Sequence, residues 1–269
     1  LLFLAAFLAH RLSLTTLGGA FLGFVSFSAA ASATYVVNDL LDIEADRSHP
    51  SKRKRPFASG ALPCQWVLVA VLLVVAAAAA APLPPLFWLG VAGYLAATTL
   101  YSIYLKRKTL VDVFTLAGLY TLRIIAGGWA VSVPVSNWLL GLSVFLFTSL
   151  AFAKRATELS EAPEEAVQAV RGRGYGRGDL PVVEQMGIAA AYASVLVMAL
   201  YISGDKVQQM YSHPNVLWLA CPVLLYWLSR MWMKVRRGLL HHDPVVFAIT
   251  DPVSLVCGSL ILAIAFAAT

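Results

Sequence analysis

Long apolar segments recur along the chain and are separated by shorter polar or basic stretches. A helix needs about 20 predominantly apolar residues to cross a bilayer, and several segments approach or exceed that length. The segments are residues 1–10 (cut short), 14–38, 64–82, 86–104, 110–133, 137–157, 183–203, 213–234 and 251–268. This pattern predicts an all-α, polytopic membrane protein with nine transmembrane helices in a single domain over residues 1–269. Because the chain begins at Leu1 rather than Met, we expect the natural start to lie upstream.

Composition and charge support the membrane class and suggest an orientation. Hydrophobic residues make up 59% of the chain and charged residues only 13%, which excludes a soluble domain of this size. Of the 20 Lys and Arg residues, 17 follow the second, fourth, sixth and eighth spans. The positive-inside rule predicts that these ends face the cytoplasm, in the cell (inner) membrane. The net charge of +6 thus forms one basic cytoplasmic face, which membrane orientation explains without any bound ligand. We therefore expect the lipid bilayer as a partner and no nucleic acid.

An acidic stretch closes the second span, in the sequence Asn38-Asp39-Leu40-Leu41-Asp42-Ile43-Glu44-Ala45-Asp46. On a helix, Asp39, Asp42 and Asp46 have the spacing i, i+3, i+7, so their carboxylates share one face. Three unpaired carboxylates repel one another, and Mg²⁺ favours carboxylates together with phosphate oxygens. The spacing therefore predicts a magnesium site. The alternative is a solvated helix end paired with the basic residues that follow.

Further polar groups gather at the ends of the same set of spans. They are Lys52 and Arg55 after the second span, Tyr101, Lys106 and Arg107 after the fourth, Asp112 and Arg123 in the fifth, Lys154, Arg155 and Glu158 at the end of the sixth, and Tyr175 in the loop 161–178. An intramembrane Arg needs an anionic partner or a water-filled cavity. Each group also has a structural interpretation: topology for the basic loops, a buried pair for Arg123, and an intrahelical ion pair for Glu158.

These residues resemble the UbiA superfamily of intramembrane transferases over nearly the whole chain. The resemblance rests on Asn38-Asp39-x-x-Asp42-x-x-x-Asp46, on His49-Pro50-x-Lys52-Arg53-x-Arg55-Pro56-x-x-x-Gly60, on Tyr101-Ser102-x-x-Leu105-Lys106, and on Asp112 and Arg123 with Ala126-Gly127-Gly128. It implies nine helices around a central cavity, with Mg²⁺ held by the first motif and bridging a pyrophosphate.

The end of the sixth span distinguishes branches of that superfamily. Prenyltransferases acting on aromatic acceptors carry a second Asp-x-x-x-Asp motif there, whereas this chain has Lys154-Arg155-x-x-Glu158-Leu159. This is similar to the decaprenyl-phosphate phosphoribosyltransferase branch, although the Gly-Arg loop 171–178 departs from the pattern expected of it. The branch implies a phosphorylated sugar diphosphate as donor and an isoprenoid phosphate lipid as acceptor.

The resemblance implies a role for each candidate residue. The predicted catalytic residues are Asp39, Asp42 and Glu158, and the predicted metal ligands are Asp39, Asp42 and Asp46. The predicted substrate-binding residues are Asn38, Lys52, Arg55, Tyr101, Lys106, Arg107, Asp112, Arg123, Lys154, Arg155 and Tyr175.

Two other functions are left open. The nearer one is polyprenyl transfer from a prenyl diphosphate to an aromatic or lipid acceptor. The other is anion transport, which would need polar residues on both sides of the membrane, whereas the outer loops carry few. The Asp-Gly and Ala-Arg elements of CDP-alcohol phosphotransferases do not follow Asp42. The sequence does not fix the lipid length, the exact donor or the oligomeric state. A homo-oligomer is one of the open possibilities.

Overall fold

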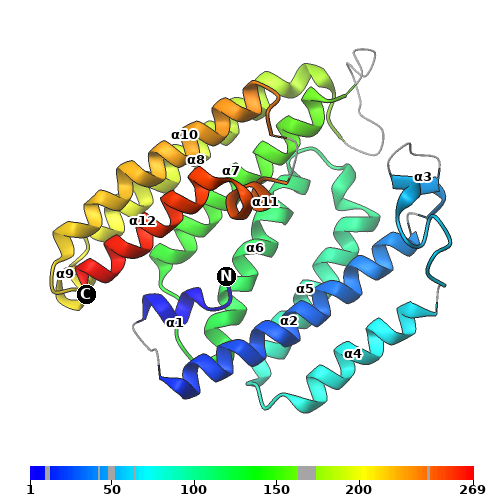
Figure 1. Ribbon diagram of the computed structural model, residues 1–269, viewed down its shortest axis with the longest axis horizontal. Helices are drawn as coiled ribbons and strands as arrows, with labels where there is room; N and C mark the ends of the chain where they lie inside the picture. The colour runs from blue at the N-terminus through cyan, green and yellow to red at the C-terminus, as the bar shows by residue number, and fades with distance from the viewer. Residues whose placement is uncertain (10–12, 42, 48–51, 64, 163–173, 241–242) are drawn as a thin grey trace. The chain divides into compact units, whose positions relative to one another are not determined.

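The structure is a computed structural model that describes residues 1–9, 13–41, 43–47, 52–63, 65–162, 174–240 and 243–269. Within those ranges every regular element is an α-helix or a short 3-10 helix and none is a strand, as Figure 1 shows. This confirms the all-α fold. The chain forms two compact units, one of Leu1–Leu105 and Leu122–Val135 and the other of Lys106–Thr121 and Ser136–Thr269. The single domain over residues 1–269 stays a prediction.

Elements of the first unit, called unit one, come mainly from the first 105 residues. They are α1 (Leu4–Leu8), α2 (Leu14–Leu41), α3 (Ile43–Arg47), the 3-10 helix η1 (Lys52–Lys54), α4 (Trp66–Ala80) and α5 (Pro85–Ile103). The helix α6 (Val111–Ala130) begins in unit two and ends in unit one. Within unit one, α2 packs against α4 and α5.

The second unit, unit two, holds the remaining helices. They are η2 (Leu105–Arg107), which begins at the boundary, α7 (Asn137–Ser160), η3 (Arg177–Asp179), α8 (Leu180–Ile202), α9 (Asp205–Met210), η4 (Pro214–Leu219), α10 (Ala220–Arg236), α11 (Pro244–Thr250) and α12 (Pro252–Ala268). The helices α7 and α8 pack along each other, and α10 packs against both α8 and α12 (Figure 1).

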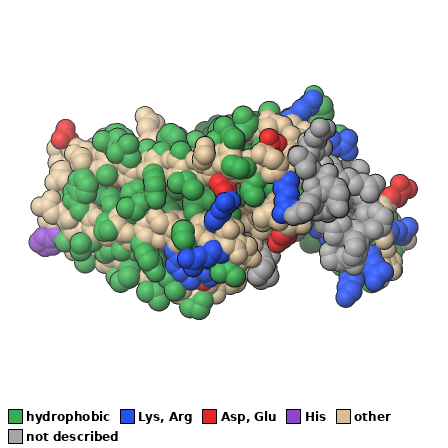
Figure 2. All heavy atoms as spheres, turned by 90° about the horizontal axis from the view of Figure 1, so that it is seen from above, with side chains coloured by type: hydrophobic (Ala, Val, Ile, Leu, Met, Phe, Trp, Pro, Cys, Tyr) green, Lys and Arg blue, Asp and Glu red, His purple; other side chains and the backbone are tan. Residues whose placement is uncertain are grey.

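Six of the described helices are long and apolar enough to cross a membrane, and the bent pair α11–α12 could form a seventh span. The two helices of that pair meet at an angle of 76°. Hydrophobic side chains make up much of the visible surface in Figure 2. The predicted total of nine spans is not confirmed, because α1 has five residues and α4 has 15. At 1.5 Å per residue these helices are shorter than a hydrocarbon layer of about 30 Å.

Helix starts in this chain follow local rules. Ser136 precedes α7, and its hydroxyl accepts a hydrogen bond from the Leu139 N–H at 3.1 Å. A side chain that accepts in this way satisfies one of the donors left over at the first turn of a helix. Pro85 occupies the first position of α5, where a helix does not need a backbone N–H.

Glycine allows close packing at the end of α6. A Cβ at Gly127 would overlap the backbone of Leu2, and a Cβ at Gly128 would lie 2.7 Å from the Val133 carbonyl oxygen. The Ala126-Gly127-Gly128 motif therefore lets the beginning of the chain and the turn after α6 approach this helix.

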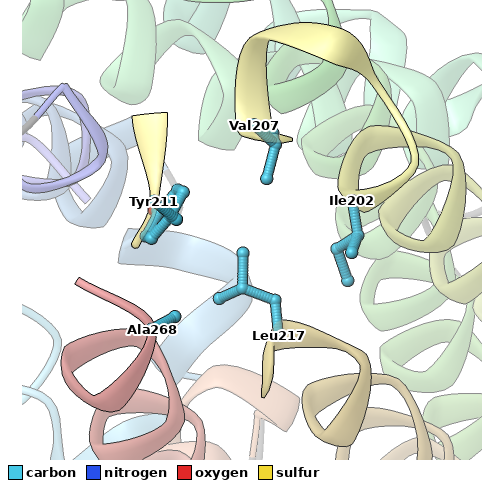
Figure 3. Close-up of a cluster of buried hydrophobic side chains, with 5 residues drawn as sticks. All are labelled: Ile202, Val207, Tyr211, Leu217 and Ala268. Carbon is cyan, nitrogen blue, oxygen red and sulfur yellow. The ribbon is translucent and has the colours of Figure 1, made fainter. Parts of the chain in front are cut away.

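A small apolar cluster lies in unit two where the ends of α8 and α12 meet α9 and η4. Figure 3 shows Ile202, Val207, Tyr211, Leu217 and Ala268 around one centre, and each is at most 7% exposed. The His213 N–H donates to the Ala268 carbonyl oxygen at 2.9 Å. These contacts fasten α9 and η4 to the end of α12.

Candidate active site

The acidic stretch lies where α2 ends and α3 begins. Asn38 and Asp39 belong to the last turn of α2, and both are partly exposed. Asp39 Oδ1 accepts a hydrogen bond from Arg55 Nη1 at 3.1 Å, with side chains that are 30% and 41% exposed. Asp42 lies outside the described residues, and the side chains of Asp46 and Lys52 are not described either. The shared face of the three acids therefore stays a prediction.

A second arginine, Arg47, organises the segment after α3. Its Nε donates to the Ala58 carbonyl oxygen at 3.1 Å, and Phe57 and Ala58 are both buried. The sequence suggested Arg47 only as one of the basic residues that could pair with the acidic stretch. Arg47 lies in the last turn of α3, where a cation can bind carbonyl oxygens. The contact holds the turn that carries Arg55, and so supports the pairing of Arg55 with Asp39.

Carboxylate oxygen is the ligand type that Mg²⁺ prefers, so Asp39 fits the ion that the sequence predicts. No group of three His, Cys, Asp or Glu residues with metal-binding geometry occurs within the described ranges. The predicted set cannot be assembled from the structure, because the side chains of Asp42 and Asp46 are not described.

Arg123 of α6 contacts a tyrosine from α5. Its Nη2 donates to the Tyr94 hydroxyl at 2.8 Å, and its guanidinium carbon lies 5.3 Å from the centre of the Tyr94 ring. Tyr94 is 3% exposed and packs against Phe27, with 4.7 Å between the centres of the two rings. The cation–π contact and the hydrogen bond stabilise an arginine within a span. Tyr94 was missed because one Tyr in an apolar helix carries no distinctive pattern.

The polar residues between α5 and α6 are accessible to different degrees. Tyr101 in the last turn of α5 and Lys106 in η2 are partly exposed, and Arg107 is exposed. The structure thus leaves Lys106 and Arg107 at the protein surface, as a phosphate-binding role would require.

A buried ionic network in unit two joins α6, α7 and the segment before α8. Arg155 Nη2 lies 2.5 Å from Asp112 Oδ2, with side chains that are 1% and 0% exposed. The Tyr175 hydroxyl donates to Asp112 Oδ1 at 2.8 Å and accepts from the Leu110 N–H at 2.6 Å. The guanidinium carbon of Arg155 lies 5.5 Å from the centre of the Tyr175 ring. Arg155, Asp112 and Tyr175 therefore contact one another away from solvent, while Asp112 Oδ2 and Arg155 Nε and Nη2 have no hydrogen-bond partner of suitable geometry among the described residues.

Glu158 is the partly exposed member of this network. Arg155 Nη1 donates to Glu158 Oε2 three residues further along α7, and the Glu158 side chain is 33% exposed. This is the intrahelical ion pair that the spacing left open as an alternative. An arginine bound by two carboxylates fixes the orientation of both. The network therefore positions one carboxylate, that of Glu158, near the surface.

Tyr175 fixes the segment at the start of α8 onto the start of α6. Burial, and then the hydrogen bond to Asp112, raise the pKa of the Tyr175 phenol above its usual range, so it stays a neutral donor. The Gly174 carbonyl oxygen accepts from Thr109 Oγ1 at 2.5 Å. A Cβ at Gly174 would lie 2.7 Å from the Arg107 carbonyl oxygen, so glycine permits this approach.

Lys154 has a different partner from its neighbour Arg155. Its Nζ lies 2.6 Å from Asp243 Oδ2, and Asp243 also caps α11 by accepting from the Val245 N–H at 2.9 Å. The two cations that the sequence reasoning treated as one phosphate-binding pair therefore contact separate carboxylates. The Lys154 side chain is 38% exposed, so it remains accessible.

Asp251 joins α10 to the bend between α11 and α12. Its carboxylate accepts from both terminal nitrogens of Arg230, at 2.7 and 3.0 Å, and from Lys234 Nζ at 3.0 Å. It also caps α12 by accepting from the Ser254 N–H at 2.9 Å. Asp251 is not among the functional residues predicted from the sequence. The signal was available, because Asp followed by Pro marks a helix start at both Asp243-Pro244 and Asp251-Pro252.

The fold and these clusters define an all-helical membrane protein with an acidic helix end and arginine-rich helix ends. Residues 1–250 match the UbiA prenyltransferase family, and the chain belongs to that family.

Three relatives illustrate the range of similar proteins. The uncharacterized protein y4nM of Sinorhizobium fredii is 39% identical over 242 residues, which are 89% of this chain and 47% of the relative. The nodulation protein NoeC of Azorhizobium caulinodans is 35% identical over 239 residues, 88% of this chain and 78% of the relative. A decaprenyl-phosphate phosphoribosyltransferase of Mycobacterium tuberculosis is 42% identical over 141 residues, 51% of this chain and 46% of the relative. The chain thus spans about half the length of the first and third of these proteins.

Proposed function

We propose that the protein transfers a phosphoribosyl group from 5-phosphoribosyl 1-diphosphate to a polyprenyl phosphate, with Mg²⁺ as cofactor. The observation that carries the proposal is the chemistry at the end of α7, where Lys154, Arg155 and Glu158 stand in place of a second aspartate pair. The accessible Lys154 cation suits a reaction in which donor and acceptor together carry three phosphate-containing groups, and the buried Arg155 orients Glu158. Similarity to decaprenyl-phosphate phosphoribosyltransferases supports the same reaction.

The reaction exchanges one bond at C1 of the ribose. A phosphate oxygen of the lipid forms a bond to C1 as the bond from C1 to the diphosphate oxygen breaks, and the diphosphate leaves with the bonding electron pair. The lipid phosphate is ionised near neutral pH, so it needs positioning more than a strong base. The residues of this chain therefore bind and orient three anionic groups.

The acidic helix end would hold the metal. Asp39, Asp42 and Asp46 would be the Mg²⁺ ligands, and Asn38 would orient a carboxylate or bind the donor. When bound, the ion would neutralise charge that develops on the leaving diphosphate. Arg55 would bind a donor phosphate, a role that its pairing with Asp39 supports because both groups then face the same substrate.

The remaining cations would bind the other phosphates. We assign this role to Lys52, Lys106, Arg107 and Lys154, with Tyr101 and Arg123 as further substrate contacts. Lys106 and Lys154 are accessible enough for it. Glu158 would accept a hydrogen bond from a ribose hydroxyl.

Burial favours a different role for three predicted substrate-binding residues. Asp112, Arg155 and Tyr175 are each at most 1% exposed, and their polar groups already bind one another. We propose that they position Glu158 rather than contact the substrate. Glu158 then remains the catalytic residue of this group.

We also propose the arrangement in the membrane. Nine helices would surround a central cavity in the cell membrane, with the basic helix ends cytoplasmic, where phosphorylated sugars are available. The distribution of Lys and Arg among the predicted loops supports this orientation. The prenyl tail of the lipid would extend between helices into the bilayer.

A second candidate is transfer of a polyprenyl group to an aromatic or lipid acceptor, which the description of the family as prenyltransferases favours. One experiment separates the two candidates. Purified protein is incubated with labelled 5-phosphoribosyl 1-diphosphate and polyprenyl phosphate, and in parallel with labelled prenyl diphosphate and acceptors. We expect a labelled lipid that depends on Mg²⁺ from the first mixture only. A labelled product from the second mixture alone would overturn the proposal.

A further inference from the structure

A groove lies on the surface of unit two between the first turns of α8 and the last turns of α10. Its volume is about 490 Å³, within the range of about 300–1,000 Å³ that is usual for ligand pockets. It contains none of the residues to which a role in the proposed reaction is assigned.

The walls of the groove are apolar and accessible. Ile188 and Tyr192 of α8 and Met233 of α10 are 36%, 50% and 51% exposed. Both helices are long and apolar enough to cross a membrane, when η3 is counted with α8 and η4 with α10. The walls would therefore meet lipid, and they suit a hydrocarbon chain.

The floor of the groove is built by a specific packing contact. Trp232 of α10 is 5% exposed, and its indole Nε1 donates to Ser149 Oγ at 3.0 Å. A Cβ at Gly187 of α8 would overlap the indole ring, so only glycine lets the ring lie there. The floor is thus fixed on both sides, by Ser149 and by Gly187.

The polar end of the groove carries one positive and one negative charge. Arg236 Nη1 lies 3.0 Å from Glu184 Oε2, and the two side chains are 68% and 14% exposed. Arg236 ends α10 and Glu184 lies in the second turn of α8, so both occupy the helix ends. Basic pockets between membrane helices bind anionic lipid headgroups, whereas here a carboxylate lies beside the arginine, so the pair offers partners for both charges of a zwitterionic headgroup.

We propose that this groove binds one zwitterionic phospholipid with a primary ammonium group, a phosphatidylethanolamine. Arg236 binds the phosphate, Glu184 binds the ammonium group, and one acyl chain lies along Ile188, Tyr192 and Met233. The headgroup thus replaces an ion pair whose arginine is exposed by two charge-assisted contacts. An anionic headgroup would meet repulsion from Glu184, and a choline headgroup has no N–H to donate.

Native mass spectrometry of the purified full chain in detergent tests this site without any dependence on the transfer reaction. The protein is mixed with equal amounts of phosphatidylethanolamine, phosphatidylglycerol and phosphatidylcholine of distinct masses. We expect the ethanolamine lipid to be retained preferentially. Arg236→Gln should lower its retention about tenfold, because a charged hydrogen-bond donor is lost. Arg237→Gln is the matched control, since it removes the same charge from the next, exposed residue.

Glu184→Gln gives a second and independent outcome. This change keeps the shape of the groove but leaves Arg236 without its carboxylate, so the preference should shift from the ethanolamine lipid to phosphatidylglycerol. Equal retention in the Arg236→Gln and Arg237→Gln variants would overturn the proposal, as would an unchanged preference after Glu184→Gln. Displacement of the ethanolamine lipid by polyprenyl phosphate at equal concentration would overturn it too, because the groove would then be a substrate site.

Discussion

The hydroxyl of Tyr175 donates a hydrogen bond to Asp112, which lies 63 residues earlier in the chain, at 2.8 Å. The same oxygen accepts from the N–H of Leu110, a residue with a φ of 65°. A residue with a bulky side chain rarely adopts this left-handed conformation, which costs roughly 1–2 kcal/mol. Tyr175 therefore stabilises a strained turn at the start of α6 and, through Asp112, the buried Arg155.

Removal of the Tyr175 hydroxyl should destabilise unit two. In Tyr175→Phe, the partly buried Leu110 N–H loses its acceptor and the buried Asp112 Oδ1 loses its donor. A buried polar group left without a partner costs about 1–3 kcal/mol. We expect a lower midpoint of denaturant unfolding for the purified protein. Tyr35→Phe is the control, because Tyr35 is 65% exposed, and an equal effect of the two changes would contradict the assigned role.

The same substitution should change activity through Glu158. If Tyr175 positions Glu158 and does not bind the substrate, Tyr175→Phe should lower kcat for phosphoribosyl transfer. The KM for 5-phosphoribosyl 1-diphosphate should stay nearly unchanged. If the Tyr175 hydroxyl bound the donor equally in the ground state and the transition state, its removal would instead raise KM and leave kcat unchanged. A large rise in KM with unchanged kcat would show that the phenol contacts the substrate.

The effect of Tyr175→Phe on the free energy of unfolding should depend on pH in the alkaline range. The folded state raises the pKa of this phenol, so it binds the proton more tightly than the unfolded state does. The resulting stability is fully present below the unfolded pKa of about 10 and is lost as pH rises towards the folded pKa. The difference in unfolding free energy between the two proteins should therefore shrink above about pH 10. A constant difference across that range would contradict the protonation argument.

The sequence predicted the helices well because apolar length is a local property. Helices α2, α5, α6, α7, α8 and α10 correspond to segments read directly from hydrophobicity. The bend between α11 and α12 was missed, although its Asp251-Pro252 cap is also local. Hydrophobicity does not register a break that leaves both halves apolar.

The candidate site could be listed from the sequence, but its contacts could not. Asp112, Arg155, Glu158 and Tyr175 were all selected, yet only packing brings Tyr175 to Asp112 across 63 residues. The spacing of Glu158 and Arg155 permitted an ion pair because both lie on one helix. The partner of Lys154, Asp243, lies 89 residues away and could not be foreseen. Local patterns thus identify residue types, and tertiary packing decides which of them are buried.

Asp251 should stabilise the corner of α10, α11 and α12 mainly through its charge. Asn caps a helix nearly as well as Asp, so Asp251→Asn keeps the cap of α12 but removes the charge that Arg230 and Lys234 share. Asp251 is 9% exposed, so loss of its charge should cost up to about 3 kcal/mol of unfolding free energy. Asp251→Ala should cost about 1 kcal/mol more, the usual worth of a cap.

Glu184→Gln provides the comparison for the Asp251 variants. It also removes a carboxylate paired with an arginine of α10, and Glu184 is itself only 14% exposed, but its single partner Arg236 is 68% exposed, so solvent screens this pair more than the two contacts of Asp251. Denaturant unfolding of the three variants measures the order. If Asp251→Asn were no more destabilising than Glu184→Gln, Asp251 would not be a structural anchor.

The metal role of Asp39 can be separated from general electrostatics at the end of α2. Glu44 lies in α3, is exposed, and belongs to the same acidic stretch without being a predicted ligand. Asp39→Asn and Glu44→Gln therefore remove the same charge from nearby positions. If Asp39 binds the metal, only Asp39→Asn should weaken binding of Mn²⁺, used as a spectroscopic substitute for Mg²⁺, and lower Mg²⁺-dependent transfer by about 100-fold or more. A similar loss in both variants would mean that the acids act through their summed charge, and normal Mn²⁺ binding by Asp39→Asn would remove Asp39 from the ligand set.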